Sequence, residues 1–291
     1  MIILLWRLIN FLYIFNQYYA NTISKEEIRI MKAIILVAGY ASRLYPLTLN
    51  TPKALLTLGG DTLLDLLMDK LHELDNIDEV VLVSNDKFYN TFCNWANDYN
   101  GKFKITVLND GTTSNETRRG AIGDIQFAID ELKIDDEIMV LVSDNYITFS
   151  FKPFYDFYRQ HGNNAILCKT FPDDQLEYLA NNFAVVNLDE NSQVNYMKEK
   201  PGGTPVSNMG AYATYFYSKE TVPLFKQYLE EGNNKDAPGN FPAWLYKHAP
   251  VYAYKCKENE ICEDIGTKDV YYALDAKITE EKQRQEDNIS M

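Results

Sequence analysis

The segment ILVAGYASRLYPLTLNTPKALL, residues 35–56, places two cations behind a tight turn. Its apolar start is typical of a buried strand, and Gly39 comes directly after that run. A glycine at this point lets backbone N–H groups face an anion with no Cβ in the way. Arg43 and Lys53 follow, each near a proline that restricts the connecting backbone. The pattern indicates a polyphosphate clamp, although the turn alone would also suit an ordinary strand-to-helix connection.

Two common phosphate-binding motifs are missing from this segment. It has no Gly-x-Gly-x-x-Gly, which argues against a dehydrogenase-like dinucleotide fold. It also has no Gly-Lys-Ser/Thr, so it is not the P-loop of an NTPase. Any anion must therefore be held in another way.

Strands and helices alternate through the first part of the chain. Short apolar runs typical of buried strands lie at 33–38, 79–84, 104–109, 137–145 and 164–169. Helical spacing of apolar residues occupies 61–74, 86–98, 120–132 and 152–161. This alternation predicts an α/β fold with a doubly wound, mixed but mainly parallel sheet.

The second half of the chain has a different pattern. Residues 183–201 read as an antiparallel hairpin around an Asp-Glu-Asn turn, and 212–218 read as a further strand. Helices are predicted at 219–231, 239–247 and 267–282. We therefore expect one domain over 31–280, with a small antiparallel β extension, followed by a polar tail at 281–291.

Polar candidate residues cluster where strands end. They occur in the segments 39–43 and 110–120, at Asp144, and at Glu199 and Lys200. In open α/β sheets, ligands bind at the carboxyl ends of the strands. The sequence thus predicts that these separate segments meet at one edge of the sheet.

The ordered motifs resemble those of the sugar-1-phosphate nucleotidyltransferases, typified by glucose-1-phosphate thymidylyltransferase. LVAGYASRLYPLTLNTPKALL is similar to the family signature Leu-Ala-(Ala/Gly)-Gly-x-Gly-(Ser/Thr)-Arg-Leu-x-Pro-Leu-Thr with its following Pro-Lys. VSDN at 142–145, KEKP at 198–201 and EDIGT at 263–267 match further motifs in the same order. The resemblance covers residues 31–275 and implies a Rossmann-like nucleotide-diphospho-sugar transferase fold.

The resemblance also implies roles for particular residues. Ala38 and Gly39 would cradle a nucleoside triphosphate, and Arg43 and Lys53 would act as catalytic cations. The remaining implied residues are Asp144 and Asp264 as ligands of Mg²⁺, Lys200 as a catalytic residue that binds the acceptor phosphate, and Glu199 as a sugar reader.

The polar loop 109–124 corresponds to the base-reading loop of the family. The family has a Gln five residues before a glycine, and here Asn115 precedes Gly120 by that spacing. The shorter amide leaves the identity of the base open. Both residues are expected to bind nucleotide, and a surface loop that caps a helix is the structural alternative.

Three departures from the family pattern are visible. Ala41 replaces its second glycine, Ser143 replaces the glycine before Asp144, and Cys262 with Glu263 replaces an aromatic pair. None of these changes removes a charged group that the chemistry needs.

Composition limits the possible functions further. The chain of 291 residues has a formal net charge of −13, which argues against general nucleic-acid binding. Its four cysteines contain no Cys-x-x-Cys pair, so a reduced, cytoplasmic protein is expected.

The apolar stretch in residues 1–30 is the most ambiguous part of the sequence. Polar residues interrupt it before it reaches the length of a membrane span. We expect a start codon assigned too early, with Met31 as the true start. A membrane-associating helix, with membrane contact only if residues 1–20 are real, and a cleaved signal remain alternatives.

Together these features predict a Mg²⁺-dependent nucleotidyltransferase that makes a nucleoside-diphospho-sugar. The partners would be a nucleoside triphosphate and a small phosphate monoester, in a homo-oligomer, with dTTP and glucose 1-phosphate as the commonest family substrates. Two alternatives stay open: a cytidylyltransferase acting on phosphocholine or a phosphonate, and a non-catalytic regulatory subunit that binds a sugar nucleotide.

Overall fold

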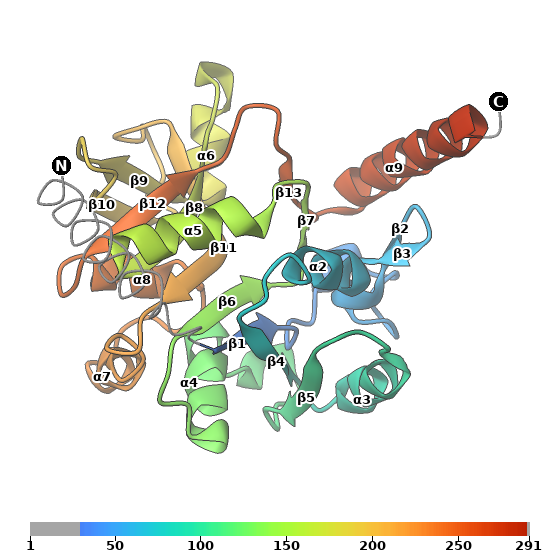
Figure 1. The fold of residues 1–291 in the computed structure, drawn as a ribbon, viewed down its shortest axis with the longest axis horizontal. Coiled ribbons are helices and arrows are strands. Elements are labelled where there is room, and N and C mark those ends of the chain that lie inside the picture. The colour runs from blue at the N-terminus through green and yellow to red at the C-terminus, as the bar shows by residue number, and fades with distance from the viewer. Residues whose placement is uncertain (1–29, 290–291) are drawn as a thin grey trace, which may run out of the picture. The chain divides into compact units, whose positions relative to one another are not determined.

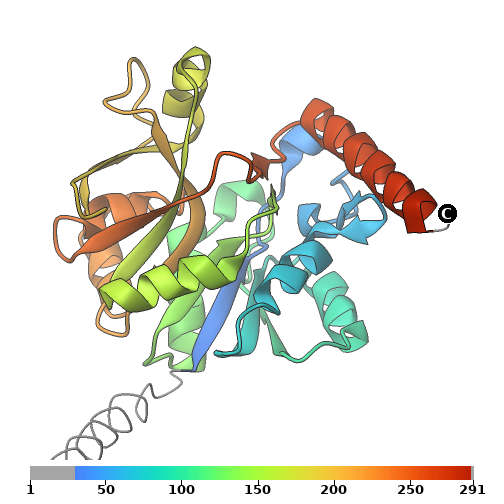
Figure 2. The same ribbon diagram turned by 45° about the horizontal axis from the view of Figure 1, so that its top comes forward.

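The computed structural model describes residues 30–289, and its main feature is a mixed nine-stranded sheet (Figures 1 and 2). The expectations for residues 1–29 lie outside this range and stay predictions. The strand order is β10-β9-β11-β6-β1-β4-β5, with β8 paired to β11 and β12 to β8. The strands are β1 (Met31–Leu36), β4 (Ile77–Ser84), β5 (Lys104–Asn109), β6 (Ile138–Val142), β8 (Asn164–Thr170), β9 (Ala184–Leu188), β10 (Val194–Glu199), β11 (Met209–Tyr217) and β12 (Val251–Lys255).

Strand direction confirms the predicted mixed, mainly parallel sheet. The half built from β5, β4, β1 and β6 is entirely parallel. Strand β11 runs against β6, β8 and β9, and β10 forms the predicted antiparallel hairpin with β9. Within the described sheet, only β10 and β11 oppose the other strands.

Helices cover both faces of the sheet, as a doubly wound fold requires. One core cluster contains residues of α2 (Leu63–Leu71), α3 (Tyr89–Asp98), α5 (Phe151–His161) and α6 (Leu176–Asn182). The other contains residues of α4 (Ala121–Leu132), α7 (Leu224–Glu230) and α8 (Asn240–Leu245). Strand β1 contributes residues to both clusters, because Ala33 and Ile35 face the first and Ile34 faces the second.

A third apolar cluster attaches the last helix to the segment that carries the two predicted cations. Helix α9 (Lys268–Ile289) packs Tyr271, Leu274 and Ile278 against Leu44 and Leu58. Leu58 belongs to the short hairpin of β2 (Thr57–Leu58) and β3 (Asp61–Thr62), which lies beside α9 (Figure 1). The predicted polar tail is helical as far as Ile289. Within residues 30–289, no helix has both the length and the apolar character that crossing a membrane requires.

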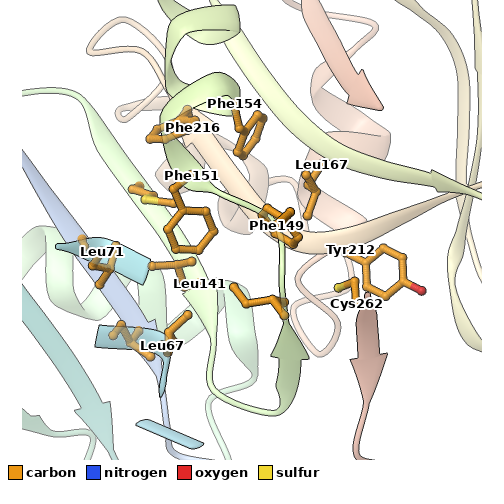
Figure 3. Close-up of a cluster of buried hydrophobic side chains, with 14 of the residues drawn as sticks. Leu67, Leu71, Leu141, Phe149, Phe151, Phe154, Leu167, Tyr212, Phe216 and Cys262 are labelled. Atoms are coloured by element: carbon orange, nitrogen blue, oxygen red, sulfur yellow. The ribbon is translucent and has the colours of Figure 1, made fainter. Parts of the chain in front are cut away.

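A small second sheet joins two segments that are far apart in sequence. The predicted strand 137–145 divides, because β6 ends at Val142 and β7 (Asn145–Ile147) pairs with β13 (Cys262–Asp264) instead. Cys262 lies in the main core near Phe149 and Tyr212, as Figure 3 shows. Burial of this thiol therefore anchors β13 where the family pattern has an aromatic residue.

Glu79 on β4 joins three neighbouring strands through charge. It is paired in register with Lys32 on β1 and Lys104 on β5. Its carboxylate contacts Lys32, Lys104 Nζ at 2.7 Å and Thr106 Oγ1 at 2.5 Å. Burial alone would raise the pKa of Glu79, but these hydrogen bonds outweigh it and lower the pKa to about 2.

We expect Glu79→Gln to lower the free energy of unfolding at pH 7 by roughly 1–3 kcal/mol. Because the pKa of Glu79 is lower in the folded protein than its ordinary value, the ionised carboxylate stabilises the fold at pH values above about 4.5. This contribution is lost as the pH falls from about 4.5 to about 2. Urea unfolding at pH 7 and at pH 3 measures both effects. Glu131→Gln, an exposed acid on α4, is the control. An equal loss of stability on acidification in Glu79→Gln and the wild type would contradict the expectation.

Candidate functional site

The turn after β1 is fixed by hydrogen bonds to the segments that follow β4 and β5. Asn85 donates its side-chain N–H to the Ala38 carbonyl at 2.8 Å, and the Tyr40 hydroxyl donates to the Thr112 carbonyl at 3.0 Å. A Cβ built at Gly39 would meet no protein atom within 4 Å. The backbone at Gly39 thus borders open space, as the predicted approach of an anion requires.

Ala41 is the strained residue of this turn. Its backbone is left-handed, with φ 45° and ψ 43°, a conformation that disfavours any residue with a Cβ. Its carbonyl accepts a hydrogen bond from Thr48 Oγ1 at 2.8 Å, which helps to hold it there. The second glycine of the family signature would adopt this conformation without strain.

We expect Ala41→Gly to raise the free energy of unfolding by up to about 1 kcal/mol, because relief of strain exceeds the added freedom of the unfolded chain. Urea unfolding provides the measurement. Ala128→Gly, in the middle of α4, controls for the general cost of glycine and should destabilise by about 1 kcal/mol or more. A fall in stability for Ala41→Gly would show that the methyl group packs favourably.

Lys53 brings the two predicted metal ligands together. Its Nζ lies 3.2 Å from Asp144 Oδ2 and 3.6 Å from Asp264 Oδ1. The pairing of β7 with β13 places Asp264 opposite Asn145, and the Ile265 N–H donates to the Asp144 carbonyl at 3.0 Å. Burial and then the charge of Asp144 raise the pKa of Asp264, while Lys53 and Arg43 lower it. Two carboxylates and two cations therefore share one small region.

Most of the predicted site residues line a single cavity of about 380 Å³ at the carboxyl ends of β1 and β6. Its walls include Ala38, Gly39, Arg43, Lys53, Asn115, Gly120 and Asp144. Asp264 is tied to this cavity through Lys53, and its neighbours Ile265 and Gly266 line the wall. The structure therefore brings three of the predicted strand ends together.

The cavity has two sides because β1 runs between β6 and β4 in the sheet. Asp144 follows β6, and we call the side with Arg43, Lys53 and Asp144 the β6 side. Helix α4 follows the loop after β5, and we call the side with Asn115, Gly120, Asp124 and their neighbours the β5 side. Charged side chains line both sides of the cavity.

Gly120 has a structural reason to be glycine, in addition to its predicted role in nucleotide binding. Its φ is 82°, and a Cβ there would lie 2.6 Å from the carbonyl oxygen of Lys235. The loop before α8 thus packs directly on this glycine. That loop also supplies Asp236 to the cavity wall, where its Oδ2 accepts from Arg118 Nη2 at 3.0 Å.

Glu199 and Lys200 do not line this cavity. Glu199 is largely buried against Gly239, and burial raises its pKa while Lys200 lowers it. Lys200 has a left-handed backbone with φ 42°, and its side chain is half exposed. Such strain in a non-glycine residue is typical of functional positions.

Four charged or aromatic residues of the cavity wall received no role of their own from the sequence: Tyr40, Arg118, Asp124 and Asp236. Arg118 and Asp124 flank the predicted Gly120, so their proximity was visible in the sequence. Asp236 arrives from a distant loop that carries none of the motifs. Within residues 30–289, no group of three or more His, Cys, Asp or Glu side chains could hold a metal ion by itself.

Comparison with known proteins identifies the family. The family model described as "Nucleotidyl transferase" matches residues 32–281. The chain belongs to this family. The resemblance carried by the four ordered motifs is thus confirmed at the level of the nucleotidyl transferase family.

Curated relatives in the nucleotidyl transferase family share part of their length with this chain. A mannose-1-phosphate guanylyltransferase 1 from Arabidopsis thaliana is 32% identical over 181 residues, which cover 59% of this chain and 45% of that protein. A mannose-1-phosphate guanyltransferase from Saccharomyces cerevisiae is 29% identical over 205 residues, with coverages of 67% and 52%. The chain spans about half the length of these relatives.

Solved structures confirm the fold of this nucleotidyl transferase family member. A UDP-glucose pyrophosphorylase complexed with UDP-glucose aligns with a TM-score of 0.72 at 16% identity, covering 87% of this chain and 99% of that one. The apo form of a UDP-glucose pyrophosphorylase gives a TM-score of 0.71 at 15% identity, with coverages of 87% and 99%. The predicted nucleotide-diphospho-sugar transferase architecture is therefore the observed one.

Proposed function

We propose that this chain is a Mg²⁺-dependent nucleotidyltransferase that joins a nucleoside triphosphate to a sugar 1-phosphate and releases pyrophosphate. The observation that carries the proposal is the Lys53 ammonium, which contacts Asp144 and Asp264 in a region shared with Arg43. Cations and carboxylates are adjacent to a turn whose backbone faces open space at Gly39. This combination suits a triphosphate better than a neutral ligand.

The reaction needs positioning and charge neutralisation more than proton transfer. An oxygen of the acceptor phosphate attacks the α-phosphorus, the bond to the bridging oxygen breaks, and pyrophosphate leaves. The acceptor phosphate is already an anion, so no general base is required. Arg43 and Lys53 stabilise the negative charge that develops on the phosphoryl oxygens and on the leaving group.

The donor set on the β6 side fits Mg²⁺. Magnesium is usually bound in such sites by one or two carboxylates together with substrate phosphates and water. Asp144 and Asp264 would hold it, since one ammonium nitrogen already contacts both carboxylates. When bound, the ion would neutralise phosphate charge and orient the triphosphate. Lys53 would then turn from the carboxylates to the phosphates.

The acceptor is proposed to bind through Lys200 and Glu199. Lys200 would hold the phosphate, and Glu199 would accept hydrogen bonds from sugar hydroxyls. The strained backbone of Lys200 and the burial of Glu199 support functional roles. The relatives' names favour a mannose 1-phosphate acceptor and a guanine nucleotide over the expected glucose 1-phosphate and dTTP.

A pyrophosphate-release screen tests this function. Five nucleoside triphosphates (GTP, ATP, CTP, UTP and dTTP) are combined with mannose 1-phosphate, glucose 1-phosphate and phosphocholine in the presence of Mg²⁺. Turnover with a sugar 1-phosphate is expected. Turnover with phosphocholine alone would favour the cytidylyltransferase alternative. Nucleotide binding with no turnover for any pair would favour the regulatory subunit.

A further inference from the structure

Two buried carboxyl groups lie together on the β5 side of the cavity, where the roles assigned so far do not use them. Asp124 is in the first turn of α4, is only 5% exposed and lines the cavity wall. Asp110 follows β5 and is 2% exposed. The metal candidates lie on the opposite side of β1.

The hydrogen-bond partners of these two carboxyl groups differ. Asp110 accepts hydrogen bonds from the Thr112 N–H at 2.6 Å and from Thr112 Oγ1 at 2.7 Å. Asp124 Oδ1 is buried and has no donor among the described residues. Burial, followed by the charge of Asp110 and a hydrogen bond to it, raises the pKa of Asp124 to about 8, against the opposing effects of Arg119 and Lys235. The raised pKa favours the protonated form of Asp124, whose O–H can donate a hydrogen bond to Asp110.

This arrangement leaves an acceptor for a ligand. A protonated carboxyl group whose O–H is engaged with Asp110 has its second oxygen free to accept a hydrogen bond. The β5 side of the cavity therefore suits a ligand group that is rich in N–H donors.

The first backbone N–H groups of α4 are already hydrogen-bonded within the protein. The N–H groups of Ala121 and Ile122 already donate to the carbonyls of Asp236 at 3.2 Å and Lys235 at 2.9 Å. Arg118 ties the same loop down through Asp236 and also donates to the Asn115 carbonyl at 2.9 Å. Side chains, more than the backbone N–H groups of α4, must therefore recognise a ligand that binds on the β5 side.

The nucleobases differ in how well they meet such an acceptor. Guanine presents its N1–H beside its amino group, and cytosine and adenine each present an exocyclic amino group. Thymine and uracil have no amino group, and carbonyl oxygens flank their N3–H. Those carbonyls would face the oxygens of the Asp110–Asp124 pair, which is an unfavourable contact between acceptors.

We propose that Asp124 determines base specificity by accepting a hydrogen bond from an exocyclic amino group, and that guanine is the base it fits best. The inference rests on the proposed nucleotidyltransferase function and narrows its nucleotide substrate. It also replaces the dTTP expected from the sequence with an amino-bearing nucleotide. Asp124 would act by direct contact with the base.

Isothermal titration calorimetry with matched nucleotide pairs tests this role. GTP and ITP differ only in the 2-amino group of the base, and dGTP with dTTP avoids a difference in the sugar. The wild type should bind GTP more tightly than ITP, and dGTP more tightly than dTTP, by on the order of 10-fold or more. CTP against UTP provides a second comparison of amino and carbonyl groups.

Three variants separate a specificity role from a structural one. Asp124→Leu has a side chain of similar size but no hydrogen-bond acceptor. This variant should bring the ratio of GTP affinity to ITP affinity close to one. Asp124→Asn can donate its amide N–H to Asp110 and keep an oxygen for the base, so it should retain the preference. Glu131→Gln, at an exposed position of the same helix, should bind like the wild type. Thermal unfolding of each variant establishes that it is folded.

The binding experiments distinguish failure of the role proposed for Asp124 from failure of the proposed nucleotidyltransferase function. Preference for UTP or dTTP would overturn the role of Asp124 and leave the proposed reaction intact. An equal loss of affinity for every nucleotide in Asp124→Leu would show a structural role and would overturn it as well. Binding of no nucleotide by the wild type would overturn both proposals.

Discussion

Replacing Lys53 by alanine is expected to lower kcat by on the order of 10³-fold, the largest effect of any single change to this site. The side chain is 12% exposed and lies within 3.6 Å of two carboxylates. Its removal takes a fixed positive charge from the place where phosphate charge develops. It also takes from Asp144 and Asp264 the one ammonium group that contacts both carboxylates, and leaves Arg43 as the nearby cation.

Arg43→Lys is the companion variant, since it keeps charge and loses the planar fork that grips two phosphate oxygens. We expect a loss in kcat on the order of 10²-fold, with pyrophosphorolysis falling in parallel because both directions share one transition state. Lys226→Ala, an exposed lysine on α7, is the control for loss of a positive charge. Unchanged turnover in Lys53→Ala would show that the polyphosphate binds elsewhere.

Asp144→Asn and Asp264→Asn should each lower kcat by on the order of 10²-fold or more at saturating nucleotide. An amide keeps the shape of the carboxylate and removes the charge that a hard divalent cation requires. The double variant should be little worse than either single one, because the two ligands act as a unit. Asp173→Asn, outside the cavity wall, is the control for loss of an acidic charge.

Direct metal binding gives a readout that does not depend on turnover. Titration of Mn²⁺, followed by its electron paramagnetic resonance signal in the presence of nucleotide, should show weaker binding in each single variant. Equal Mn²⁺ affinity in the wild type and in both variants would assign the carboxylates a purely electrostatic role toward Lys53. Turnover close to that of the wild type in both variants would exclude them from the reaction.

Much of the fold could be predicted because local pattern and tertiary burial agree. Strand β5, which forms one edge of the sheet, was predicted with its observed bounds, since KITVLN is rich in β-branched residues. Helix α6 and strand β12 were not predicted. Helix α6 is a single short stretch in a polar context, and β12, which pairs with β8, alternates apolar residues with Tyr and Lys.

The site was predictable to the extent that each motif follows its own strand. Arg43, Lys53 and Asp144 all lie next to β1 or β6, so their convergence follows from a parallel sheet. Asp236 could not be predicted, because a hydrogen bond to Arg118 and two backbone contacts bring in its loop. The proximity of Asp110 and Asp124 was hidden for a similar reason, because only the fold brings these two carboxyl groups within hydrogen-bonding reach of each other.

The pairing of β7 with β13 has a consequence for how the protein is made on the ribosome. All strands of the central sheet precede residue 256, whereas Asp264 comes later in the chain. A nascent chain can therefore bury most of its core while one of the two carboxylates is still inside the exit tunnel. The proposed capacity to bind a divalent ion should accordingly appear late in synthesis, after the sheet has formed. Stalled chains in which residue 264 is still inside the tunnel should differ from released chains in metal affinity far more than in compactness.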